Sequence, residues 1–211
     1  MDQTIAILGV GRVGGALAQT FTRAGYAVRL GVRPSADVTD VLKRCHGWAQ
    51  AAPVRDAAAA ADVVFLTVPA ASARDAAREA GDLTGKVLVD CTNPVVWQDG
   101  PVLAPPPEGS VAAALAAALP GVKVVKGFNT FGAEIHLDPS VAGLPAEVYL
   151  AGDDGGALEI VGAIASRSGF APIAVGPLRN AAHLEALAVL WIGLATQGGQ
   201  GRGFIFRIAR R

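Results

Sequence analysis

The segment TIAILGVGRVGGALAQTFTRA, residues 4–24, decides the fold. Its apolar start, residues 4–8, predicts a buried β-strand, and Gly9, Gly11 and Gly14 follow at once in the spacing G-x-G-x-x-G. An amphipathic helical pattern comes directly after these glycines. In such a strand–turn–helix unit, Gly9 permits the tight turn, Gly11 lets a pyrophosphate approach the backbone, and Gly14 lets helix and strand pack closely. The segment therefore predicts dinucleotide binding at the helix N-terminus, with a purely structural turn as the alternative.

Short runs rich in Val and Ile alternate with alanine-rich helical stretches along the rest of the chain. The predicted strands are residues 4–8, 27–31, 62–68, 86–90, 122–127, 147–151 and 171–175, with a further short strand near 48–51. The predicted helices are residues 12–24, 35–45, 70–80, 110–119, 154–168 and 179–196, with a helical turn at 56–61. This alternation predicts an α/β fold with a doubly wound, mostly parallel sheet of the Rossmann type, whose ligands bind at the carboxyl ends of the strands.

The expected organisation is a dinucleotide-binding Rossmann domain over residues 1–138 and a small C-terminal α/β lobe over residues 139–211. The proline-rich residues 93–109 are expected to form an irregular loop beyond the fifth strand, where they could cover a site. The apolar side chains Leu187, Leu190, Trp191 and Leu194 recur at helical spacing and predict core packing, with a dimer contact as the alternative.

Composition narrows the class of protein. The chain has 211 residues, of which 52% are hydrophobic and 17% charged, so it can bury a large core and is not expected to be disordered. Eighteen basic residues balance eighteen acidic ones, which gives no support to nucleic-acid binding. The longest apolar runs fall short of the ~20 residues that span a bilayer, so no membrane association is expected. Cys45 and Cys91 lie far apart in a chain with no signal-like start, and we expect a cytoplasmic protein with reduced thiols.

The end of the second predicted strand indicates which cofactor is used. NAD-preferring sites carry an acidic residue about 20 residues after the glycines. Here no acidic residue lies between Asp2 and Asp37, and the strand is followed by Arg33. A guanidinium can bind a 2′-phosphate through two hydrogen bonds, and the missing carboxylates would remove a repulsion. The pattern favours NADP(H); the alternative is that Arg33 is a solvated loop charge.

Two further strand ends are candidates for the walls of the cofactor site. The fourth predicted strand ends in Thr67, Val68 and Pro69, and the fifth is followed by Asn93 and Pro94. Both ends belong to the carboxyl edge of a parallel sheet, where the nicotinamide ribose and ring would lie. The alternative is that the prolines only terminate strands.

The chain resembles the NADP-dependent coenzyme F420 oxidoreductase family, whose members pass hydride between NADPH and the deazaflavin F420. The resemblance is carried by the order of several motifs: the glycine motif, Gly31-Val32-Arg33, residues 66–69, 89–94, 109–110, 125–130, 151–154 and 176–178. It implies NADP(H) and coenzyme F420 as cofactors, a small-molecule hydride acceptor and a homodimer. The candidate cofactor-binding residues are Gly9, Val10, Gly11, Arg12, Val13, Arg33, Thr67, Val68, Pro69, Asn93 and Pro94.

Val10 and Val32 stand where well-studied family members carry hydroxyl residues, so NADP binding depends on Arg33 with fewer supporting contacts. The resemblance also assigns the acceptor pocket to Asn129, Thr130 and residues 176–180, and gives the C-terminal lobe at residues 139–211 a part in this pocket and in possible dimer contacts.

Direct hydride transfer between stacked rings requires orientation and exclusion of water rather than an acid or base. We therefore expect no catalytic side chain and no metal site. The histidines are scattered without ligand spacing, and only His136 follows the presumed acceptor side. One alternative function is an NADPH-binding redox sensor without turnover. Another is an NADPH-dependent reductase of a ferric chelate or an imine. Pyrroline-5-carboxylate reductases and β-hydroxyacid dehydrogenases are less favoured, because residues 140–211 are too few for their all-helical domain and are partly predicted as strands.

Overall fold

The computed structural model describes residues 3–209 and residue 211, and within them eight strands form one sheet. These strands are β1 (Ile5–Leu8), β2 (Val28–Val32), β3 (Ala49–Pro53), β4 (Val63–Leu66), β5 (Val87–Asp90), β8 (Lys123–Lys126), β11 (Glu147–Gly152) and β12 (Ala171–Ala174). Their order is β12-β11-β8-β5-β4-β1-β2-β3. All neighbours are parallel except β11, which runs antiparallel to β8. The predicted doubly wound, mostly parallel sheet is confirmed.

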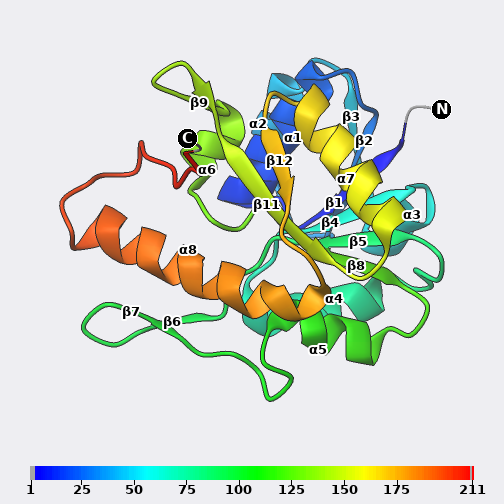
Figure 1. Cartoon of the computed structure of the whole chain (residues 1–211). Helices are drawn as coiled ribbons and strands as arrows, with labels where there is room; N and C mark the ends of the chain where they lie inside the picture. The colour runs from blue at the N-terminus through cyan, green and yellow to red at the C-terminus, as the bar shows by residue number, and fades with distance from the viewer. Residues whose placement is uncertain (1–2, 210) are drawn as a thin grey trace.

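Helices cover both faces of this sheet because alternate strand residues point to opposite sides. Ile5 and Ile7 join the core beneath α1 and α7, whereas Ala6 and Leu8 join the core beneath α3, α4 and α5. Figure 1 shows α7 on one side of the sheet and α4 and α5 on the other. The helices are α1 (Arg12–Arg23), α2 (Thr39–Arg44), α3 (Val54–Ala59), α4 (Ala73–Glu79), α5 (Val111–Ala118), α6 (Ala133–Leu137), α7 (Gly155–Arg167) and α8 (Ala181–Thr196), with 3₁₀ turns at Ala70–Ser72 and Leu178–Asn180. None of the helices in residues 3–209 combines the length and apolarity of a bilayer-spanning helix.

The carboxyl-terminal strands continue the same sheet. β11 and β12 extend it beyond β8, so the sheet runs across residue 138. Helix α6 and the small hairpin β9 (Ser140–Val141) with β10 (Leu144–Pro145) precede β11, and the sequence predicted neither. The division into a domain at 1–138 and a lobe at 139–211 stays a prediction.

The expectation of an irregular loop at residues 93–109 is wrong for part of that segment. β6 (Val95–Trp97) and β7 (Pro101–Leu103) form an antiparallel hairpin, and its turn is fixed because the Gln197 side chain donates to the carbonyl of Asp99. The hairpin extends alongside α8 (Figure 1). Strands of three residues that pair only with each other are too short to show a period in sequence.

Helix α2 is shorter than predicted. The sequence pattern placed its start at residue 35, whereas the helix begins at Thr39. The cause is local: the Asp37 carboxylate accepts a hydrogen bond from the backbone N–H of Thr39 at 3.0 Å, which favours a turn over a helix at residue 37. Residues 33–38 therefore form an open loop at the carboxyl end of β2.

Candidate functional site

The glycine turn after β1 has the geometry that the motif predicts. Gly9 has φ +97°, and a Cβ there would lie 2.7 Å from a methyl group of Val68. A Cβ at Gly14 would lie 2.2 Å from the carbonyl oxygen of Gly9, so only glycine fits between helix and turn. A Cβ at Gly11 would meet nothing within 4 Å, because the backbone there faces open space. No side chain caps the first turn of α1 and that turn carries no acidic residue, which leaves its N–H groups available to an anion.

Two cavities lie along the carboxyl edge of the sheet. The first, which we call the dinucleotide cavity, measures about 570 Å³. It is lined by Leu8, Gly9, Val10, Gly11, Gly31, Val32, Arg33, Ala36, Asp37, Val38, Val54, Thr67, Val68, Pro69, Ser72, Asp75, Ala76 and Glu79. The second, which we call the proline cavity, measures about 610 Å³. Pro69 and Asp75 line both, so the cavities share a wall.

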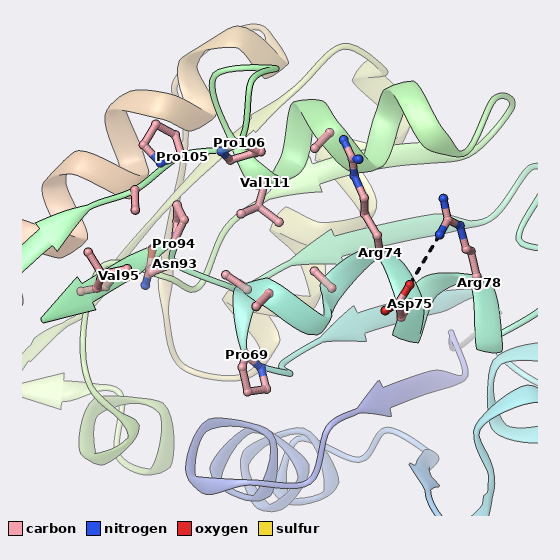
Figure 2. Close-up of a pocket in the computed structure, with 16 residues that line it drawn as sticks. Pro69, Arg74, Asp75, Arg78, Asn93, Pro94, Val95, Pro105, Pro106 and Val111 are labelled. Atoms are coloured by element: carbon pink, nitrogen blue, oxygen red, sulfur yellow. Dashed lines mark hydrogen bonds and ion pairs between the residues drawn. The ribbon is translucent and has the colours of Figure 1, made fainter.

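Figure 2 shows how the proline cavity is enclosed. Pro94, Pro105 and Pro106 come from the segment that carries the β6–β7 hairpin, and Pro69 closes the side toward the glycine turn. Arg74 lies on α4 and forms an ion pair with Glu108. The walls are mainly apolar, and the charged lining residues are Arg74, Asp75 and Arg78, of which Asp75 lies 3.5 Å from the Arg78 guanidinium (Figure 2).

Most of the predicted cofactor-binding residues line one of these cavities. Those in the dinucleotide cavity are Gly9, Val10, Gly11, Arg33, Thr67, Val68 and Pro69. Pro69, Asn93 and Pro94 line the proline cavity. Arg12 and Val13 line neither of the two. The Arg12 guanidinium instead donates to Glu134 on α6 at 2.8 Å, so its role toward a pyrophosphate stays a prediction.

Arg33 is exposed and lines the dinucleotide cavity, and its guanidinium forms no hydrogen bond or ion pair with the described residues. Its guanidinium is available to an incoming anion. The sequence argument that carboxylates are missing here requires a correction, because Asp37 lines the same cavity. Asp2, the other acid of that argument, lies outside the described residues. The spacing rule for acidic residues after β2 could not predict that Asp37 lines the cavity, because the position of Asp37 depends on how the 33–38 loop folds back.

Thr67 braces the glycine turn. Its hydroxyl donates to the carbonyl of Gly9 at 2.6 Å, which ties the end of β4 to the turn after β1. The two strand ends that form the wall of the dinucleotide cavity are thereby fixed relative to each other.

A buried ion network lies behind the Asn93 wall, and sequence reasoning missed it. The Lys126 ammonium is fully buried and lies 2.8 Å from Asp90 Oδ2 and 2.8 Å from Glu185 Oε1. It also donates to the carbonyl of Thr92 at 2.5 Å. Glu185 Oε1 accepts from the backbone N–H of Val111 as well, whereas Glu185 Oε2 is buried without a hydrogen-bond partner among the described residues. Burial raises the pKa of the Glu185 carboxyl, and the Lys126 charge opposes that rise.

Asn93 is held in one orientation by Asn129. The Asn93 amide donates to the Asn129 carbonyl at 2.8 Å, and the Asn129 side chain donates to Asn93 Oδ1 at 2.8 Å and to the carbonyl of Leu184 at 3.0 Å. Phe128, just before this pair, has φ +56°, a conformation that is costly for a residue with a side chain. Its ring is fixed between Phe65 and Phe170, with centroids 5.4 Å away on each side. The packing holds the turn that brings Asn129 to Asn93.

Asn129 belongs to this pair and Thr130 follows it, and none of the predicted acceptor residues Asn129, Thr130 and 176–180 lines either cavity. Asn129 and Thr130 are each 4% exposed. In the 176–180 loop, the Leu178 N–H donates to Asp153 at 2.9 Å and the Asn180 amide donates to the Val175 carbonyl. Their assignment to an acceptor pocket stays a prediction.

Two titratable groups singled out by the sequence are buried. The ring nitrogens of His136 lie 2.9 Å from the Gly132 carbonyl and 2.8 Å from the Phe128 carbonyl. Burial lowers the pKa of this histidine, which these carbonyls partly offset. Burial raises the pKa of the Cys91 thiol well above its usual range, so the thiol behaves as a small apolar group.

Known proteins are similar to this chain along most of its length. Residues 4–94 match the model of the family described as NADP oxidoreductase, coenzyme F420-dependent. The F420-dependent NADP reductase of Methanothermobacter thermautotrophicus is 32% identical, over 92% of this chain and 90% of that protein. A solved structure from Arthrobacter sp. FB24, to which F420-dependent NADP reductase activity has been attributed, has a TM-score of 0.86 and 32% identity, covering 99% of this chain and 100% of its own. The metalloreductase STEAP3 of Rattus norvegicus is 28% identical over 87% of this chain but only 36% of its own length.

Proposed function

Because this chain belongs to the family of coenzyme F420-dependent NADP oxidoreductases and is an NADP-dependent oxidoreductase, we propose that it transfers a hydride between NADP(H) and a deazaflavin of the F420 type. One observation carries the proposal. The glycine turn opens at Gly11 onto a cavity that also holds an unpaired Arg33. A phosphate-binding turn and a free guanidinium in one cavity match the two anionic groups of an NADP molecule, its pyrophosphate and its 2′-phosphate.

The residues present fit NADP(H). The backbone at Gly11 leaves the space that a pyrophosphate needs, and the uncapped N-terminus of α1 supplies N–H donors and a positive dipole. Arg33 would bind the 2′-phosphate. Bound NADPH would supply the hydride, and the chain would orient it and exclude water.

Asn93 and Pro94 would form walls beside the nicotinamide half of NADP(H). Asn93 would present a fixed edge, because its amide is locked by Asn129, while Pro69 and Pro94 would add rigid apolar walls. A rigid, mainly apolar surround favours direct transfer between two rings by holding them close and keeping water out. No side chain needs to act as acid or base in this scheme.

The acceptor is proposed to be F420 because the methanogen relative that bears this name is 32% identical and matches 90% of its length. We propose that Asn129, Thr130 and the 176–180 loop line the acceptor side, next to the locked Asn93. A ferric chelate is the second candidate, favoured by the similarity to a metalloreductase.

We also propose that the protein works as a homodimer. Val96, Trp97 and Val102 on the β6–β7 hairpin and Leu190 on α8 are exposed apolar side chains. The hairpin and α8 lie side by side, so these residues belong to neighbouring elements (Figure 1). Trp191, by contrast, is 3% exposed and packs in the core, as the sequence pattern predicted, whereas that prediction is wrong for Leu190, which is 53% exposed.

The test is turnover with defined acceptors. Purified protein and NADPH are mixed with oxidised F420, and in parallel with FMN and with a ferric chelate, while the acceptor absorbance is followed. Loss of the deazaflavin band is the expected result. NADPH binding without reduction of any acceptor would refute the proposed activity and leave a dinucleotide-binding sensor.

The cofactor assignment is tested by Arg33→Ala. The variant should bind NADPH about tenfold less tightly, near the lower end of the range for a charge-assisted hydrogen bond because Arg33 is exposed, and should bind NADH unchanged. Arg44→Ala, which removes the same charge from the end of α2 outside the cavity, is the control. Equal losses for NADPH and NADH would refute the role of Arg33.

A further inference from the structure

Asp37 stands in the same cavity wall as Arg33. The backbone N–H of Ala36 donates to the carbonyl of Arg33 at 2.9 Å, and this turn folds the loop back so that Asp37 lines the dinucleotide cavity. The two side chains come from one short loop after β2, the position that faces the adenosine ribose in a dinucleotide-binding fold. A cation and an anion therefore share the part of the cavity where the 2′ substituent would lie.

The Asp37 carboxylate is held in place and charged. Its Oδ1 accepts from the backbone N–H of Thr39 at 3.0 Å, at the start of α2. This backbone hydrogen bond and one from the Thr39 side chain hold the pKa of Asp37 below its ordinary value. Asp37 forms no ion pair with any described residue, so no bonded cation neutralises the charge of its carboxylate.

The other acids of the cavity belong to a different element. Asp75 and Glu79 lie on α4, and Asp75 is 3.5 Å from the Arg78 guanidinium. Only Asp37 shares a loop with Arg33, so it is the acid best placed to oppose that arginine.

We propose that Asp37 is a specificity-determining residue that makes the preference for NADP(H) over NAD(H) smaller; the inference rests on the proposed function. A 2′-phosphate carries roughly −1.5 to −2 charges at pH 7, as phosphate monoesters do, and an ionised carboxylate in the same cavity repels it. The same carboxylate accepts a hydrogen bond from the free 2′-hydroxyl of NAD(H). Val10 and Val32 add no hydroxyl that could strengthen phosphate binding. Arg33 and Asp37 therefore act in opposite directions on the choice of cofactor.

The experiment measures dissociation constants for NADPH and NADH by nucleotide fluorescence, with wild type, Asp37→Asn and Asp40→Asn. Asparagine can still accept the Thr39 hydrogen bond, so the loop is expected to keep its fold. Asp40→Asn makes the same charge change three residues away, on α2 and outside the cavity lining.

Asp37→Asn should raise the ratio of NADPH to NADH affinity about threefold at low salt, as expected for one exposed charge pair, and Asp40→Asn should leave the ratio unchanged. The same ratio in Asp37→Asn and wild type, or an equal rise in both variants, would overturn the inference. Because binding is measured, a protein that binds both nucleotides but reduces no acceptor would refute the proposed hydride transfer alone. A wild type that binds neither nucleotide would overturn both.

Discussion

Lys126→Met should destabilise the protein strongly, because it leaves the Asp90 and Glu185 carboxylates buried without their cation. All three side chains are fully buried, and Lys126 lies 2.8 Å from each carboxylate and also holds the Thr92 carbonyl. Removing one member of a buried ion pair costs about 3–5 kcal/mol, a large part of the ~5–15 kcal/mol that holds a typical domain together. For a chain of this size, the melting temperature should fall by roughly 6–20 °C.

The loss should depend on pH in a defined direction. Burial already raises the pKa of Glu185 above the ordinary value of 4.5, and Lys126 is the charge that opposes this rise. Without Lys126 the folded-state pKa moves further above the unfolded one, so the folded state binds more protons and loses stability as pH rises. The deficit relative to wild type should be smallest near pH 4.5 and grow toward neutral pH.

Urea denaturation followed by circular dichroism at pH 5 and pH 7.5 measures both effects. Lys123→Met is the matched control, since Lys123 lies on the same strand in an exposed pair with Asp154 at 3.3 Å and should cost less than about 1 kcal/mol. The double variant Lys126→Met with Glu185→Gln should recover part of the loss, because only one buried carboxylate then remains. A Lys126→Met deficit no larger than that of Lys123→Met, or one that does not change with pH, would refute the reasoning.

Two further predictions use matched pairs of variants. Gly14→Ala should lower the free energy of unfolding by about 1–3 kcal/mol and also lower NADPH affinity, because the new methyl group meets the Gly9 carbonyl. Gly11→Ala should weaken NADPH binding without a loss of stability, because a Cβ there meets nothing within 4 Å. Melting curves and nucleotide titrations separate the two outcomes, and equal melting temperatures would contradict the packing argument. Trp97→Ser should shift the solution mass measured by light scattering from dimer toward monomer, while Trp48→Ser should not, although both rings are exposed to a similar degree, 60% and 59%. An unchanged mass in Trp97→Ser would exclude the hairpin as the dimer contact.

The sheet and its main helices could be predicted because they follow local rules. Strands buried on both faces appear as apolar runs, and each of the predicted strands has a counterpart in the sheet. The elements that were missed, α6 and the hairpins β6–β7 and β9–β10, have five residues or fewer per element, so no periodicity could indicate them. Their formation depends on tertiary contacts, such as that between Gln197 and the hairpin turn.

The geometry of the glycine turn after β1 likewise follows from local rules. Gly9 and Gly14 are required by close approaches that the motif spacing already implies, whereas the backbone at Gly11 faces open space. The position of Asp37 in the cavity lining could not be predicted, because it depends on a turn in the loop after β2 rather than on distance along the sequence.

Two charged residues in the sequence indicate the buried ion network of Lys126, Asp90 and Glu185, which sequence reasoning missed. Lys126 ends a strand predicted to be buried, and Glu185 is the only acidic residue between residues 181 and 196. A charge in such a position needs an opposite charge nearby, because an isolated buried ion is too costly to keep. Pairing these two residues would have placed α8 against the end of β8, and therefore beside Asn93 and Asn129. The structure makes that pairing through Lys126 and Glu185, and the Asn129 side chain donates to the carbonyl of Leu184, the residue before Glu185, so the buried charges help to hold α8 against Asn129.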